Sequence, residues 1–143
     1  MVIMNRVLSF LILFLAIAAC KPEPKELVIT GEWELSNIAA KTKSVTIGHE
    51  TVSVYVSFNS DNSFVLYQKL GEGFYRKFNG SWTLVEALLS GKYSDGNAWA
   101  TDYQLSLSDD GNYLTMTPIK ADSEELVYKK TSIPEKVKND SME

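Results

Sequence analysis

Few side chains in this sequence could carry out acid–base or nucleophilic chemistry, since the 143 residues include one Cys and one His. A serine-hydrolase triad needs Ser, His and an acid. The candidate base, His49, lies in residues 47–50, a stretch typical of a solvent-facing turn. Two carboxylates could act as a glycosidase pair, yet nearly all the acids fall in predicted turns or at strand ends, Asp102 and Glu86 excepted. We therefore expect that the protein is not an enzyme.

Two acidic turns, residues 94–97 and 108–112, combine Asp, Gly and Asn in the manner of calcium loops. They lack the twelve-residue spacing and the terminal bidentate Glu of an EF-hand. Asn, Asp and Gly are also the residues that tight turns favour, because they tolerate positive φ angles. One Cys and one His cannot build a zinc cage by themselves. The sequence therefore predicts neither a metal site nor a cofactor.

The lone Cys has a specific context. Cys20 follows a branched aliphatic and two small residues (17–19), at the end of an apolar run, 7–19, that Arg6 precedes. The run is shorter than the roughly 20 residues of a membrane-spanning helix and matches the hydrophobic region of a secretory signal. The pattern resembles the bacterial lipobox, whose Cys carries fatty acyl chains such as palmitate. The resemblance implies a lipoprotein signal peptide at 1–19; an ordinary cleaved signal or a buried core Cys is the alternative.

Lipidation of Cys20 would decide where the protein resides. Two or three acyl chains anchor a protein stably, whereas one gives marginal binding. Residues 20–26 combine the lipidated Cys with a charged, Pro-rich spacer that would hold a domain off the membrane. Cys20 is not followed by Asp, which in enteric bacteria favours inner-membrane retention. We therefore expect the cell envelope, at the outer membrane, facing the periplasm or the exterior. The net charge of −4 argues against a nucleic-acid partner.

The rest of the chain alternates between apolar and polar residues. Val52, Val54 and Val56 recur at every second position, which is the period of a β-strand. Clusters of Asn, Asp, Gly and Ser separate such runs and predict tight turns. The predicted strands are 31–38, 44–47, 51–59, 63–70, 74–85, 88–93, 98–108, 112–118 and 124–130, of which 44–47 and 51–59 become one strand if they join through a bend at Gly48.

Short connections and regular spacing predict an all-β fold, an eight-stranded antiparallel up-and-down β-barrel over residues 27–131, with a sandwich as the alternative. Residues 79–80 could form a hairpin turn or a kink in one long strand. The kink is favoured, because Phe78 and Trp82 keep the same parity across it. Residues 132–143 are mostly polar and are predicted to form a C-terminal tail or one loose helical turn.

A Gly-x-Trp sequence, residues 31–33, opens the first predicted strand. It resembles the signature of lipocalins, and residues 27–134 are similar to the lipocalin-like lipoproteins common in Bacteroidetes, which have calycin-type barrels and are mostly uncharacterised. The resemblance implies that Trp33 plugs one end of the barrel. In lipocalins an Arg near the last strand packs over this Trp, whereas the last predicted strand here offers Lys129 and Lys130.

The interior of such a barrel can be filled by side chains or can hold one small ligand. We expect the barrel to bind a small apolar or amphipathic ligand in a cavity of about 300 Å³ or more. The alternative is a filled barrel that docks an envelope protein or glycan through its loops or its tyrosine-bearing outer face. The inward candidates are Phe64, Leu66, Phe74, Phe78, Trp82, Trp99 and Tyr103. The predicted ligand-binding residues are Phe64, Phe74, Trp99 and Tyr103.

Overall fold

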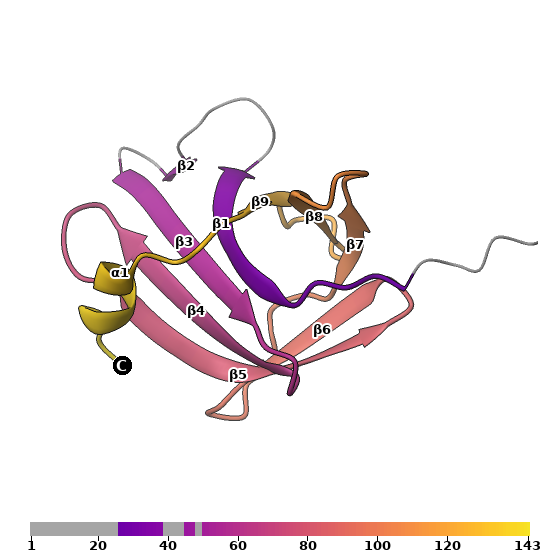
Figure 1. Cartoon of the computed structure of the whole chain (residues 1–143), viewed down its shortest axis with the longest axis horizontal. Helices are drawn as coiled ribbons and strands as arrows, with labels where there is room; N and C mark the ends of the chain where they lie inside the picture. Colours follow the sequence, from indigo (N-terminus) through magenta and orange to yellow (C-terminus); the bar gives the residue numbers. More distant parts are fainter. Residues whose placement is uncertain (1–25, 39–44, 48–49) are drawn as a thin grey trace, which may run out of the picture.

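The computed structural model describes residues 26–38, 45–47 and 50–143, which form one closed antiparallel sheet and a short helix (Figure 1). The strands are β1 (Gly31–Ile38), β2 (Val45–Ile47), β3 (Glu50–Phe58), β4 (Ser63–Leu70), β5 (Arg76–Val85), β6 (Leu88–Tyr93), β7 (Tyr103–Leu107), β8 (Tyr113–Pro118) and β9 (Leu126–Lys130). The helix is α1 (Glu135–Asn139). β1 and β3–β9 make the eight-stranded barrel that the sequence predicted.

Strand β1 closes the barrel, because it is hydrogen-bonded along both edges. One edge pairs with β3, where Gly31 faces Phe58 and Glu34 faces Tyr55. The other edge pairs with β9, with a register irregularity before Asn37. The short strand β2 pairs with the first three residues of β3. It is therefore a separate hairpin arm, and the predicted joining of 44–47 to 51–59 as one strand is not observed.

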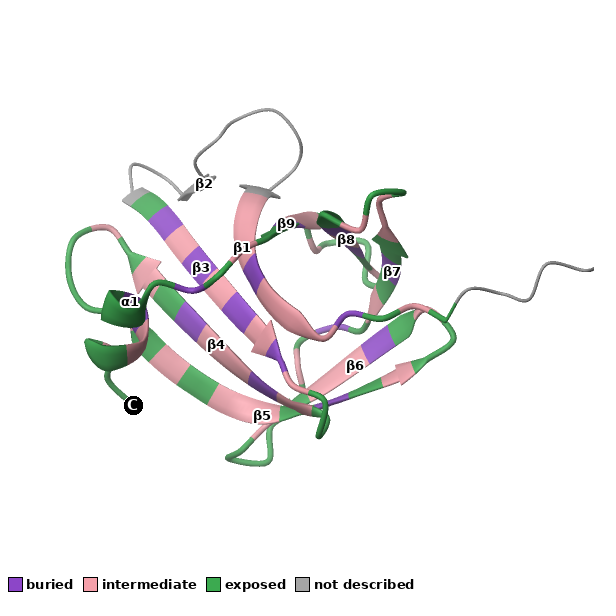
Figure 2. Cartoon of the chain, in the orientation of Figure 1, coloured by how far each residue is buried: buried purple, intermediate pink, exposed green. Residues whose placement is uncertain are grey.

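The alternation in the sequence becomes an inner and an outer face. Figure 2 shows buried and less buried residues taking turns along β3. Val52, Val54, Val56 and Phe58 all point inward and are at most 7% exposed. Trp33 on β1 is fully buried among the inward side chains. Its indole N–H donates to the carbonyl of Ile29 over 2.9 Å.

Strand β5 runs unbroken through Gly80, so the predicted single long strand is confirmed and the hairpin alternative is wrong. A Cβ atom at Gly80 would collide with the carbonyl oxygen of Lys92 on β6 and with the ring of Phe64 on β4. Only a glycine lets the three strands approach this closely.

The predicted strand 98–108 is shorter in the structure and begins at Tyr103. Ala98 bridges to Lys92, and the N–H of Trp99 donates to the carbonyl of Gly91 over 2.9 Å, but residues 100–102 leave the ladder. The chain returns where Leu89 faces Tyr103, so β6 and β7 pair at two positions. This pairing is the shortest around the barrel.

The C-terminal segment was predicted to form a tail or one loose helical turn; it contains the short helix α1, and this helix packs against the barrel. Ile133 and Val137 are buried against Tyr67 on the outer face of the sheet, where α1 lies beside β3, β4 and β5 (Figure 1). Met142 continues the contact: its N–H donates to the carbonyl of Tyr75, and its carbonyl accepts from Lys77. The C-terminal segment therefore covers part of the outer face of the sheet.

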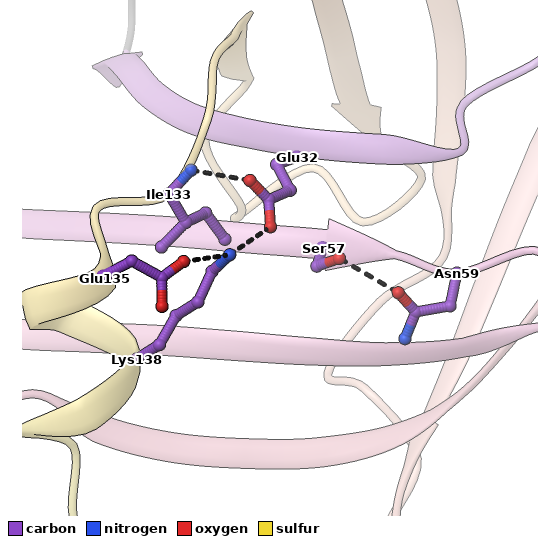
Figure 3. A network of polar contacts seen from close by, with 6 residues as sticks. All are labelled: Glu32, Ser57, Asn59, Ile133, Glu135 and Lys138. Atoms are coloured by element: carbon purple, nitrogen blue, oxygen red, sulfur yellow. Dashed lines mark hydrogen bonds and ion pairs between the residues drawn. The ribbon is translucent and has the colours of Figure 1, made fainter.

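Glu32 on β1 fastens this segment through polar contacts (Figure 3). Its carboxylate accepts the N–H of Ile133 over 2.7 Å and lies 2.9 Å from the ammonium of Lys138, which also pairs with Glu135. Burial alone would raise the pKa of Glu32, but the hydrogen bonds from Lys138 and Ile133 outweigh burial and lower the pKa.

The lowered pKa predicts a pH-dependent stability. A carboxylate with a depressed folded-state pKa stabilises the fold above its unfolded value, here 4.5, and loses that contribution as pH falls through the folded value. We expect Glu32→Gln to be less stable than the wild type at neutral pH, and the difference should shrink as pH falls through the folded-state pKa of Glu32, below which both side chains are uncharged. Urea denaturation at a series of pH values measures this. A stability difference that does not change with pH would contradict the assigned role.

Candidate functional site

A cavity of about 300 Å³ that is open to solvent lies between the inward faces of the strands. Aliphatic side chains from β3 and β8, including Val54 and Met116, form one part of the wall. Aromatic side chains form another part. Ala100, in the segment that leaves the ladder before β7, lines the cavity and is exposed, so it lies at the opening.

The aromatic side chains form a continuous edge-to-face series. The ring centroids of Phe64 and Trp99 are 5.1 Å apart, those of Trp99 and Tyr103 are 6.2 Å apart, and those of Phe64 and Tyr93 are 5.8 Å apart. This geometry is favourable for aromatic pairs and fixes the positions of large apolar surfaces. The ring of Trp99 also occupies the space that a Cβ atom at Gly91 would need.

The structure brings together three of the four predicted ligand-binding residues. Phe64, Trp99 and Tyr103 all line the cavity. Phe74 does not, and it is 67% exposed. The predicted inward placement of Phe74 is wrong, because β5 begins at Arg76 and the preceding turn carries the chain outward through two glycines with positive φ, at positions 71 and 73.

The wall also contains three polar side chains that were not among the predicted ligand-binding residues, Gln68, Tyr93 and Tyr128. Tyr93 was not among the predicted inward residues. It shares the parity of Leu89, a fully buried residue on the same strand, and this signal could have placed it inward. Tyr128 likewise shares the parity of Leu126, which also lines the cavity.

The three tyrosines of the cavity are held in their neutral form. Burial raises the pKa of Tyr128, and negative charge on Tyr103 or Tyr93 would raise it further. Burial likewise raises the pKa of Tyr103 and of Tyr93. At neutral pH all three phenols are therefore hydrogen-bond donors. Among the hydrogen bonds between described residues, none engages any of these hydroxyls.

Lys130 takes the place that the resemblance assigned to an Arg. Its ammonium nitrogen lies 5.6 Å from the ring centroid of Trp33, within the range of a cation–π contact. Lys130 and Trp33 are directly opposite each other in the pairing of β1 with β9. Trp33 itself is outside the lining of the cavity.

A wider groove of about 910 Å³ lies between residues 26–30 and the β5–β6 turn. Its lining includes the carboxylates Glu26 and Glu86, whereas the inner cavity is lined by uncharged side chains. The uncharged, largely apolar lining of the inner cavity is thus the better match to sites that hold small molecules.

The other candidate residues behave as turn residues where the structure describes them. Asp95 and Asp110 each accept the backbone N–H of the residue two positions on, at 2.9 and 3.0 Å. Asp102 and Glu86 are exposed, and His49 lies outside the described residues. No group of three or more His, Cys, Asp or Glu able to hold a metal ion occurs among the described residues. Within the same residues, no helix has the length and apolarity to cross a membrane.

A closed eight-stranded β-barrel with an apolar inner cavity is the architecture of small-ligand-binding barrels. A family model described as a lipocalin-like domain matches residues 29–128. The chain therefore belongs to the family of lipocalin-like domains, whose fold is generally one for binding. No curated protein matches the chain.

The contact between Trp99 and Gly91 predicts a context-dependent substitution. Gly91→Ala should lower the free energy of unfolding by about 1–3 kcal/mol, because the new methyl group displaces the indole ring. In a Trp99→Ala background the same change should cost less than about 0.5 kcal/mol, since the ring is gone. Urea denaturation of the four proteins gives the coupling. Equal losses in both backgrounds would show that the ring does not set the requirement for glycine.

Proposed function

We propose that this protein is a lipid-anchored carrier of the bacterial cell envelope that holds one small apolar or amphipathic ligand inside its barrel. The observation that carries the proposal is the cavity of about 300 Å³ with aromatic and aliphatic walls. This size lies at the lower end of the range for ligand sites. It also favours a hollow barrel over the filled interaction module, which would leave no such space.

The composition of the wall supports an apolar or amphipathic ligand. Removing apolar ligand surface from water stabilises the complex roughly in proportion to the area buried. The polar groups of the wall are few and uncharged: Gln68 and the three tyrosine hydroxyls. A small number of fixed polar groups in an apolar site orients a ligand.

The membrane anchor is proposed from the sequence. Residues 1–25, which include the lipobox, lie outside the described residues. Acyl chains on Cys20 and the spacer to residue 26 would keep the barrel next to the outer membrane, where apolar molecules partition. An anchored carrier of this kind would take up or deliver its ligand at the membrane surface.

The opening of the cavity offers a direct test of the binding site. Residues 21–143 contain every described element, and 1-aminoanthracene is a small neutral probe that fluoresces in apolar surroundings. Ala100→Phe should weaken its binding about tenfold or more, a change of ~1.4 kcal/mol, because the new ring blocks the opening. Ala98→Phe is the matched control: Ala98 is exposed, close in sequence and outside the lining. Equal affinities for both variants would exclude this cavity as the site.

The anchor has its own test. In a bacterial host supplied with labelled palmitate, the wild-type chain should incorporate label and sediment with membranes. Cys20→Ser should abolish the label, because serine lacks the thiolate that accepts the lipid. Ser9→Ala changes the leader without touching the motif and should retain the label. A wild-type chain that is secreted with a free thiol at Cys20 would contradict the lipoprotein assignment.

A further inference from the structure

We propose that the cavity is built for a neutral ligand that presents a hydrogen-bond-accepting oxygen, such as a ketone or another carbonyl compound, to the hydroxyl of Tyr128. This inference rests on the proposed carrier function and adds the chemical class of the ligand. It excludes a fatty-acid-like anion whose carboxylate enters the barrel.

The buried hydroxyl of Tyr128 is the first observation in favour of a ligand with an acceptor oxygen. It projects inward from β9, between Leu35 on β1 and Leu114 on β8, and it is 6% exposed. It lines the cavity, and no hydrogen bond between described residues engages its hydroxyl. Leaving a buried hydroxyl without a partner costs free energy. An acceptor oxygen on a ligand inside the cavity would remove that cost.

Two further donors face the same space. Tyr103, at the start of β7, and Tyr93, at the end of β6, line the cavity with Tyr128. They are near enough to Tyr128 that a charge on either one would raise its pKa. Since all three stay protonated, each hydroxyl can donate to an acceptor.

The charge of the lining decides between a neutral acceptor and an anion. None of the described residues that line the cavity is Lys, Arg, His, Asp or Glu. An anion held there would be buried without a counter-charge, which is strongly unfavourable. Arg76 faces Gln68 across the β4–β5 pairing, but it is exposed and outside the lining. A neutral carbonyl meets the phenols without this penalty.

The volume limits the size of the ligand. A space of about 300 Å³ equals the liquid volume of roughly ten water molecules. A compact molecule with one or two fused rings has this size, and the edge-to-face series of Phe64, Trp99 and Tyr103 offers flat apolar surfaces to such rings. Three naphthalenes of matched shape therefore serve as probes: 2-acetylnaphthalene has a neutral acceptor, 2-isopropylnaphthalene has none, and 2-naphthoate is an anion.

The experiment is calorimetric titration of residues 21–143 with each probe at neutral pH. The ketone should bind at least about tenfold more tightly than the naphthoate, because only the anion is buried without a counter-charge. Tyr128→Phe should weaken ketone binding about threefold to tenfold, the loss of one hydrogen bond, and leave the hydrocarbon within twofold. Tyr67→Phe is the matched control, since Tyr67 is equally buried but lies under the C-terminal segment. It should change neither affinity.

The hydrocarbon also separates the two proposals. If it binds and Tyr128→Phe weakens neither probe, the neutral-acceptor inference is overturned while the carrier function stands. If naphthoate binds most tightly and Arg76→Gln abolishes that preference, the site takes anions and the inference is wrong. If none of the three probes binds, the carrier function fails together with the inference.

Discussion

The backbone hydrogen bonds along both edges of β1 hold this structure together, because they turn an open sheet into a closed barrel. The side chains of β1 then serve three different surfaces. Trp33 fills the interior beneath Lys130, Leu35 lines the cavity, and Glu32 faces outward to fasten the C-terminal segment. A shift of β1 by one residue would exchange the inner and outer positions of all three. The core, the cavity and the docked helix therefore share one register.

The cavity follows from how the closed interior is filled. Phe64, Trp99 and Tyr103 occupy much of the space with rings that meet edge to face. Val52, Val54 and Val56 on β3 contribute short side chains to the wall, and short side chains leave room inside the barrel. Ala100, in the segment that leaves the ladder between β6 and β7, and Gln68 on β4 both line the cavity and are exposed, so the cavity is open to solvent near each of them.

Sequence alone predicted the strands well, because inward and outward residues alternate so regularly. The same alternation correctly predicted that β5 continues through Gly80. The alternation misplaced Phe74. Extending the pattern of β5 from Phe78 back to Phe74 ignores the two glycines that turn the chain before β5. It missed the break at residues 100–102, where no Pro or Gly signals the departure from the ladder.

The packing of Ile133 and Val137 could not be predicted from the sequence. Two apolar residues four apart in a polar stretch can lie on one face of a helix, but only the folded sheet shows that Tyr67 provides a surface for that face. Tyr128 looked like one more core residue, and its role became visible only from the cavity around it.

The central claim is that the interior is hollow at Phe64, Trp99 and Tyr128, and diffraction from a xenon-pressurised crystal of residues 21–143 tests it most directly. Xenon enters apolar cavities and gives strong density there. We expect xenon, or a co-purified small molecule that excludes it, in the space enclosed by these three side chains. A barrel whose side chains close that space, with neither xenon nor other density inside, would contradict the carrier function.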